Sequence, residues 1–347
     1  MIVKSWLATA RQSVIRCSVV IGLLLLPGLV SATSYADRDE VRVFIAEMVA
    51  EHGFNADALR ELFADAERSD SILESIARPA ERVRPWYDYR CIFLTSSRVT
   101  QGVEFWEENA AALTRAEETY GVSASMVVAI IGVETLYGRH KGRHRVLDAL
   151  STLAFDYPPR SAFFRRELKE FLVLAEEEGK DPRSLYGSYA GAMGYGQFIP
   201  SSYRAYAVDF DGSGVRDIWD NRTDAIGSVA NYLGVHGWQD GEPVALRVAD
   251  NGSIDEALLN NGLTLPHRVA DLRLAGLNIS TEVADGQRAA LVEKELASGR
   301  EIWLGLQNFY VITRYNRSSM YALAVYQLAA AIEAARAGNE APYGVCQ

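Results

Sequence analysis

Residues 124–138 read ASMVVAIIGVETLYG. The first ten of these residues are almost wholly apolar, and an acidic residue, Glu134, closes this run. Ser123 precedes the run and is a residue type that is typical of a helix N-cap. A helix that is apolar on all sides is buried in a protein, so residues 124–134 predict a helix of the core. Glu134 then closes a buried helix, where desolvation disfavours the carboxylate and raises the carboxyl pKa.

A glutamic acid with a raised pKa can donate a proton near neutral pH, which is what the cleavage of a glycosidic bond requires. Glu134 is therefore a candidate general acid. The alternative is a glutamate at a helix end that points to solvent and takes no part in chemistry. The helix pattern alone does not choose between these two interpretations.

The rest of the chain is predicted to be mainly helical. Apolar residues recur at helical spacing in several segments, namely 39–52, 57–66, 100–120, 162–178, 223–233 and 318–337. Between 241 and 313 the pattern changes to short β-favouring runs, such as 244–248 and 309–313, separated by Asn-Gly and Asp-Gly turn signals. We therefore expect a mainly α (α+β) fold, in which a small β-containing subdomain is inserted into a helical protein.

Composition excludes several classes of protein. The chain has 347 residues, a formal net charge of -10, 49% hydrophobic residues and 10% aromatic residues. This content is too apolar and too aromatic for a disordered chain. A nucleic-acid-binding surface would need clustered positive charge, so the acidic balance argues against nucleic acid as a partner.

The first 36 residues have the pattern of a secretory signal peptide. Basic residues precede an apolar segment, 17–30, that is shorter than the about 20 residues of a comfortable membrane span. Small residues follow, and cleavage is expected after Ala36, with Ala32 as the alternative position. An uncleaved N-terminal anchor is the competing interpretation. The pattern predicts a soluble exported protein, most simply a periplasmic one.

Residues 187–201 read GSYAGAMGYGQFIPS, in which closely spaced glycines let a ligand approach the backbone. A phosphate-binding loop is the obvious rival, but no Lys-Ser/Thr follows and the GxGxxG spacing is absent, so a nucleotide is not expected. Ser188 and Gln197 are neutral polar residues, suited to the hydroxyls and amides of sugars.

Residues 209–220, DFDGSGVRDIWD, have the ligand spacing of an EF-hand calcium loop. Two substitutions weaken the pattern, because serine stands at loop position 5 and the shorter aspartate at position 12. The candidate ligands for structural Ca²⁺ are Asp209, Asp211, Ser213, the carbonyl of Val215, Asp217 and Asp220. An acidic turn without metal is the alternative. No organic cofactor is expected.

Two cysteines, Cys91 and Cys346, lie outside the expected signal peptide. In an oxidising compartment such a pair is a candidate disulfide. Two independent thiols are equally compatible with the sequence, because sequence supplies no geometry.

Four ordered motifs together resemble the lytic murein transglycosylase B family. They are GVETLYG at 132–138, GSYAGAMGYGQFIPSSY at 187–203, the acidic loop 209–220, and NFYVITRYN at 308–316. The resemblance runs from about residue 39 to 335. It implies a catalytic domain over 37–340, with a helical N-terminal part (about 37–120), a lysozyme-like core (about 121–240 and 314–337) and the β-containing subdomain (about 241–313).

The resemblance also assigns roles to residues. Glu134 matches the single catalytic acid/base of the family, and the substrate is peptidoglycan. The residues that match substrate contacts are Ser188 and Gln197 for the N-acetylated sugars, Tyr315, Asn316 and Tyr321 for the cleft wall, and Arg160 for the peptide stem. The family commonly has paired arginines after Tyr-Pro, and this chain keeps only Arg160.

The implied reaction uses one carboxylate twice. Glu134 protonates the β-1,4 glycosidic oxygen between N-acetylmuramic acid and N-acetylglucosamine, and then deprotonates the muramyl 6-hydroxyl, which closes a 1,6-anhydro ring. The alternatives are a muramidase that hydrolyses the same bond, for which Asp148 or Asp156 would be the second acid, and a non-catalytic peptidoglycan-binding protein. The expected partner is the glycan strand, and other cell-wall enzymes are further candidates.

Overall fold

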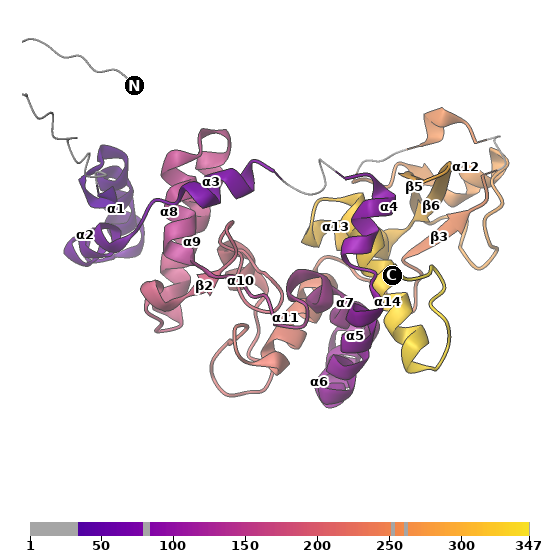
Figure 1. The fold of residues 1–347 in the computed structure, drawn as a ribbon, viewed down its shortest axis with the longest axis horizontal. Coiled ribbons are helices and arrows are strands. Elements are labelled where there is room, and N and C mark those ends of the chain that lie inside the picture. The colour runs from indigo at the N-terminus through magenta and orange to yellow at the C-terminus, as the bar shows by residue number, and fades with distance from the viewer. Residues whose placement is uncertain (1–33, 79–83, 251–253, 260–262, 347) are drawn as a thin grey trace, which may run out of the picture. The chain divides into compact units, whose positions relative to one another are not determined.

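The computed structural model describes residues 34–78, 84–250, 254–259 and 263–346. The expected signal segment up to residue 33 lies outside the described residues. Helix α7 (Ala124–Thr135) has eleven of its twelve residues buried. It packs against α5 (Ser96–Glu108), α11 (Arg222–Val235) and α14 (Ser319–Arg336) (Figure 1). The prediction of a core helix is confirmed, although the Ser123 side chain makes no capping hydrogen bond.

Helices make up most of the described chain, which confirms the predicted fold class. The remaining α-helices are α1 (Asp39–His52), α2 (Ala56–Asp65), α3 (Asp70–Ile76), α4 (Trp86–Tyr89), α6 (Ala110–Tyr120), α8 (Val146–Asp156), α9 (Ser161–Glu177), α10 (Pro200–Tyr206), α12 (Val269–Leu274) and α13 (Gln307–Tyr315). The predicted helix 39–52 has the bounds of α1, which ends at Gly53 in the left-handed conformation that glycine favours.

Two predicted elements were wrong. The segment 100–120 is not one helix, because the chain turns at Asn109 between α5 and α6. The run 309–313, predicted as a strand, lies inside α13. Its β-branched and aromatic residues favour a strand in isolation, but burial of Phe309, Val311 and Ile312 fits a helix whose apolar side faces the core. Tertiary packing therefore overrides the local preference.

The β-containing subdomain is a four-stranded antiparallel sheet with the order β3-β6-β5-β4. Its strands are β3 (Ala245–Val248), β4 (His267–Arg268), β5 (Arg288–Glu295) and β6 (Arg300–Gly305). Side chains alternate between faces. Leu291 and Leu304 enter a small core of the subdomain, whereas Val292 and Trp303 join the large helical core. Both faces of the sheet are covered, so the subdomain is fixed to the helices.

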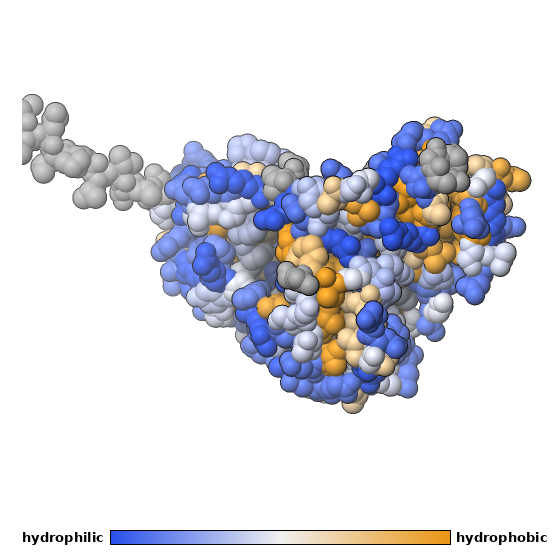
Figure 2. Space-filling model, turned by 45° about the vertical axis from the view of Figure 1, so that its right-hand side comes forward, coloured by the Kyte–Doolittle hydropathy of each residue, from blue (hydrophilic) through white to orange (hydrophobic). Residues whose placement is uncertain are grey.

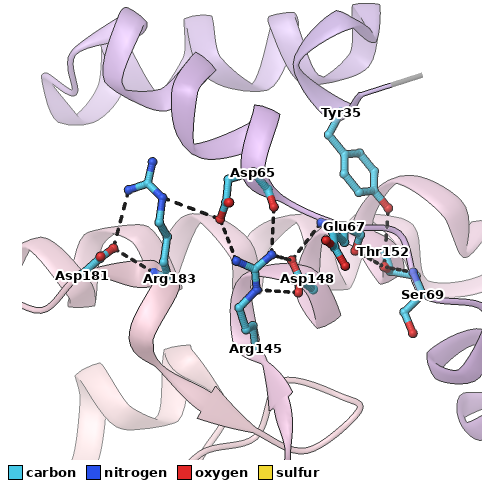
Figure 3. A network of polar contacts seen from close by, with 9 residues as sticks. All are labelled: Tyr35, Asp65, Glu67, Ser69, Arg145, Asp148, Thr152, Asp181 and Arg183. Carbon is cyan, nitrogen blue, oxygen red and sulfur yellow. Dashed lines mark hydrogen bonds and ion pairs between the residues drawn. The ribbon is translucent and has the colours of Figure 1, made fainter. Parts of the chain in front are cut away.

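The N-terminal helices are tied to the core by a polar network around Arg145 (Figure 3). The guanidinium makes ion pairs with Asp65 Oδ2 at 2.6 Å and with Asp148 Oδ2 at 2.7 Å. Asp148 also accepts a hydrogen bond from the backbone N–H of Glu67 at 2.9 Å. The segment between α2 and α3 is thus held against α8.

Tyr35 is the first residue of the described chain that is buried in the hydrophobic core. Its side chain is only 2% exposed, and its hydroxyl donates to Asp156 Oδ2 at 2.6 Å. Arg38 completes the cluster, with its guanidinium 4.3 Å from the Tyr35 ring centre and 2.9 Å from Asp156 Oδ1. The chain is therefore packed from a point before the expected cleavage position after Ala36.

A disulfide joins Cys91 to Cys346, whose Cα atoms are 5.4 Å apart and whose positions differ by 255 residues. Of the two alternatives that the sequence left open, the structure has the bridge. The backbone N–H of Cys346 also donates to the carbonyl of Leu94 at 2.6 Å. The C-terminal segment is therefore held against the segment that follows α4.

Hydrophilic residues cover much of the face in Figure 2, and apolar residues gather toward its middle and right-hand side. The large apolar side chains that are exposed include Val43 and Val49 in α1 and Leu274 in α12. In the described part of the chain, no single helix has the length and apolar character to cross a membrane. Helices α6 and α7 meet that test only as a pair bent by 115°.

Candidate active site

Glu134 is the one residue of α7 that is not buried. Its helix ends one residue later, because Leu136 and Tyr137 both adopt positive φ angles, of 50° and 59°. Thr135 stabilises this turn, since its Oγ1 accepts from the N–H of Gly138 at 3.0 Å and lies 3.0 Å from the Tyr195 carbonyl oxygen. The turn leaves the Glu134 carboxylate at the border between the core and solvent.

Tyr321 fixes the orientation of this carboxylate. Its hydroxyl donates to Glu134 Oε1 at 2.6 Å, across 187 residues of sequence. Tyr321 lies in the first turn of α14, where the Ser318 hydroxyl caps the helix by accepting from the Tyr321 N–H at 3.2 Å. The C-terminal helix therefore supplies a direct partner for the candidate acid.

Tyr315, at the end of α13, contacts the same region. Its hydroxyl donates to the carbonyl of Gly196 at 2.5 Å. Burial first, and the negative charge of Glu134 second, raise the pKa of both Tyr315 and Tyr321 well above the usual tyrosine value. Both phenols consequently stay protonated at neutral pH and remain hydrogen-bond donors.

The glycine block, residues 187–201, follows a two-residue strand pair, β1 (His144–Arg145) with β2 (Tyr186–Gly187). Ser188 Oγ accepts from the N–H groups of Ala190 at 3.3 Å and Ala192 at 3.1 Å. Gln197 has a positive φ of 51°, and its Nε2 donates to the carbonyl oxygens of Gly194 at 2.9 Å and Lys141 at 3.2 Å. Both predicted sugar contacts thus hold the backbone of the block in place.

The backbone of the glycine block also lies very close to the backbone of the loop after α7, at Gly142. A Cβ on Gly142 would lie 1.9 Å from the Gly187 carbonyl carbon and 2.4 Å from the Ser188 nitrogen. No side chain fits that space, and the φ of +99° is one that glycine alone adopts readily. The loop and the glycine block are therefore in backbone contact.

Two predicted contact residues lie at helix ends. Asn316 is the half-buried C-cap residue of α13, directly after Tyr315. Arg160 is exposed at the N-cap of α9, with its guanidinium 4.4 Å from the ring centre of Phe163. Asn316 is therefore next to a residue that contacts the glycine block, whereas Arg160 lies over an aromatic ring of its own helix.

The two acids that follow Glu134 most closely in sequence are both engaged elsewhere. Asp148 is held by Arg145. Asp156 accepts from Tyr35 and pairs with Arg38. Each carboxylate thus stabilises the fold through a cationic partner.

The acidic loop gathers part of the predicted ligand set. Ligand oxygens of Asp209 and Asp211 group with one of Asp224, all within 4.8 Å of one another. Ser213 Oγ lies 3.5 Å from Asp209 Oδ1 and 3.4 Å from the Val215 carbonyl oxygen. Asp209 and Asp211 therefore come together with Asp224, and Ser213 lies between Asp209 and the Val215 carbonyl.

The carboxylates of the other two predicted ligands turn elsewhere. Asp217 Oδ1 accepts from the N–H groups of Trp219 at 3.0 Å and Asp220 at 3.1 Å. Asp220 pairs with Lys141 at 3.0 Å. These bonds close the end of the loop and connect it to the segment after α7.

Asp224 was missed because it lies beyond the twelve-residue pattern, in the first turn of α11. Its side chain is fully buried and accepts from the N–H groups of Phe210 at 2.8 Å, Asp211 at 3.2 Å and Asp217 at 2.9 Å. Burial raises the pKa of the Asp224 carboxyl, and these hydrogen bonds oppose the rise. A search for acids just past the loop would have found it.

Comparison with known proteins gives a family and a curated relative. Residues 36–330 match the family described as "Transglycosylase SLT domain". The chain is 45% identical over 311 residues to membrane-bound lytic murein transglycosylase B of Escherichia coli (strain K12). The match covers 87% of this chain and 85% of that protein.

Solved structures agree in fold over the same range. Soluble lytic transglycosylase SltB1 from Pseudomonas aeruginosa has a TM-score of 0.82 at 52% identity, covering 86% of this chain and 99% of that one. Escherichia coli Slt35 in complex with calcium has a TM-score of 0.80 at 44% identity, and the match covers 87% of this chain and 95% of that one. Pseudomonas aeruginosa SltB3 in complex with NAG-NAM-pentapeptide has a TM-score of 0.76 at 33% identity, and the match covers 85% of this chain and 79% of that one.

The backbone contact at Gly142 predicts a specific loss of stability. We expect Gly142→Ala to lower the free energy of unfolding by about 1–3 kcal/mol more than Gly53→Ala, through overpacking against Gly187. Gly53 is the matched control, because it also has a positive φ, of +75°, and open space around its Cβ position. Urea unfolding of both variants measures the difference, and equal losses would contradict the contact.

Proposed function

The chain belongs to the transglycosylase SLT domain family of lytic murein transglycosylases, which cleave glycosidic bonds of peptidoglycan, and from this premise we propose that Glu134 alone supplies the acid and the base. Glu134 as an acid donates its proton to the oxygen between N-acetylmuramic acid and N-acetylglucosamine. The C–O bond then breaks and the N-acetylglucosamine end leaves as an alcohol.

In the second step the Glu134 carboxylate acts as a base. The substrate's own N-acetyl group stabilises the positive centre left on the muramyl C1, in place of a second enzyme carboxylate. Glu134 removes the proton of the muramyl 6-hydroxyl, and that oxygen bonds to C1. The product is a 1,6-anhydro ring, no water is consumed, and Glu134 regains the proton that it gave.

The hydrogen bond from Tyr321 to Glu134 is the observation that carries this proposal. It gives one carboxylate a fixed orientation at the edge of the core, as a group that must protonate one oxygen and deprotonate another requires. The engagement of Asp148 and Asp156 with arginines supports a mechanism without a second acid. Ser188, Gln197, Tyr315 and Asn316 are proposed to contact the sugars, from the block and helix end beside Glu134.

Replacement of the candidate acid tests the mechanism. We expect Glu134→Gln to lower the rate of 1,6-anhydromuramic product formation by about 10²–10⁴-fold, because an amide cannot transfer the proton. Glu118→Gln, on the exposed side of α6, is the control with the same chemical change. The measurement is mass spectrometry of muropeptides released from cell walls. Activity of Glu134→Gln within a few-fold of the unmodified protein would reject the assignment.

We further propose that the acidic loop binds calcium in a structural site. The donors that gather there are all oxygens, from Asp209, Asp211, Ser213, Val215 and Asp224, which suits a hard cation with six to eight ligands. Oxygens of three carboxylates lie within 4.8 Å of one another, and a cation would reduce the repulsion between their charges. Magnesium demands a stricter octahedral geometry and should fit less well. Slt35, a relative, is known in complex with calcium.

Calcium should therefore raise the melting temperature by mass action. At about ten times its Kd, a ligand that binds only the folded state adds about 1.4 kcal/mol. We expect Asp209→Ala to abolish this increment. Asp220→Ala is the matched control, because Asp220 belongs to the same loop and its carboxylate pairs with Lys141. Equal melting temperatures in chelator and in millimolar calcium would exclude the site.

We propose that the chain is exported and released by cleavage after Ala32, the alternative position that the signal pattern allows. Cleavage after Ala36 would remove Tyr35, which is 2% exposed and hydrogen-bonded to Asp156. Removal of the Tyr35 ring would leave a cavity in the core and would lower the free energy of unfolding. The intact mass of the exported protein should thus correspond to a chain that begins at Thr33. A mass for a chain beginning at Asp37 would contradict this proposal.

A further inference from the structure

A cavity of about 380 Å³ lies beside the glycine block. We call it the lysine cavity. Its walls come from three segments, the loop after α7, the connection from α9 to β2, and the end of the acidic loop. The side chains that give it chemical character are Lys141, Lys180, Tyr186, Trp219 and Asp220.

The charges in the lysine cavity do not balance. Lys141 pairs with Asp220 at 3.0 Å. Lys180 is half-buried and forms no ion pair with any residue that the structure describes. The lining therefore keeps one uncompensated positive charge, in a chain whose net charge is -10. A partly desolvated ammonium group gains from an anionic ligand more than a fully solvated one does.

Two aromatic side chains, Tyr186 and Trp219, form part of the walls of the lysine cavity. The Lys180 Nζ lies 5.4 Å from the ring centre of Trp219, and Tyr186 is 50% exposed. Trp219 is 8% exposed, and its indole nitrogen is buried, so this N–H is not a donor to a ligand in the cavity. The ammonium group of Lys180 is therefore the uncompensated donor of the lining, and a carboxylate is a complementary ligand for it.

The wall of the lysine cavity is in backbone contact with the glycine block, whose residues are proposed to contact the sugars. Gln197 donates to the carbonyl of Lys141 at 3.2 Å, and Gly142 meets the backbone of Gly187 and Ser188. The Lys141 Nζ lies 5.0 Å from the ring centre of Tyr195 in the glycine block. The cavity and the glycine block are therefore neighbours on the same loop, so one ligand that carries both a sugar and a charged group could contact both.

We propose that the lysine cavity binds a carboxylate of the peptide stem carried by the glycan strand, with Lys180 as the main recognition residue. This inference rests on the proposed function. The sugar hydroxyls and acetamido groups are neutral, whereas any pentapeptide stem ends in a carboxylate. SltB3, a relative, is known in complex with NAG-NAM-pentapeptide. Arg160, the stem contact that the family resemblance implies, is not among the residues that line this cavity.

The test compares two substrates with the whole mature protein. One is glycan strands with pentapeptide stems, and the other is the same strands after removal of the stems, which leaves only the lactyl carboxylate of the muramyl residue. The readout is the ratio of kcat/KM values on the two substrates, from 1,6-anhydromuramic ends counted by mass spectrometry. We expect Lys180→Gln to lower this ratio about three- to tenfold, the effect of one charge-assisted contact in a partly solvated site.

Further variants make the outcome decisive. Lys180→Arg should keep most of the preference and Lys180→Glu should reduce it further, whereas Arg60→Gln, the same loss of charge on the exposed side of α2, should leave the ratio unchanged. Equal losses on both substrates in Lys180→Gln would mean that the lactyl carboxylate or the glycan is recognised, and would overturn the proposal. Full activity of Lys180→Gln on both substrates would also overturn it. An unmodified protein that forms no 1,6-anhydro ends would instead reject the proposed function.

Discussion

A helix without a polar face has to be enclosed on all sides, and the enclosure of α7 organises the rest of the structure. Four helices pack around it, including α5 before it in the chain and α14 near the C-terminus. Enclosure brings α14 beside the end of α7, so Tyr321 reaches Glu134 across 187 residues. One carboxylate at the edge of a dry core is the consequence. The same packing that satisfies an apolar helix therefore holds this carboxylate in the orientation on which the proposed proton transfer depends.

Backbone strain is concentrated around this carboxylate. In the described part of the chain, the non-glycine residues with positive φ are Leu136, Tyr137 and Gln197. Two of them follow Thr135, the last residue of α7, and the third lies in the glycine block. Such conformations cost on the order of 1–3 kcal/mol each and persist only where surrounding contacts impose them. Here the Tyr137 hydroxyl donates to the Arg98 carbonyl and the Gln197 amide to two carbonyls.

Sequence patterns were sufficient where local and tertiary preferences agree. The amphipathic spacing of α1 and its terminal Gly53 gave the helix bounds, and the apolar run before Glu134 gave the buried helix α7. They failed where packing decides. The run that contains Phe309 favours a strand locally but fills a helical site in the core. Asp224 joins Asp209 only because α11 folds back onto the loop, which no spacing rule within the loop can express.

The acidic loop supports the glycine block through its backbone. Ile218, at its end, accepts from the N–H of Tyr195 at 3.0 Å, and a Cβ on Gly194 would lie 2.4 Å from the same carbonyl oxygen. This approach sets the course of the glycine block, whose Gln197 in turn holds Lys141. A cation bound between Asp209 and Asp224 would therefore act by fixing the loop from which Ile218 supports the block. Its contribution to the reaction proposed at Glu134 would be positional, made through hydrogen bonds of the chain itself.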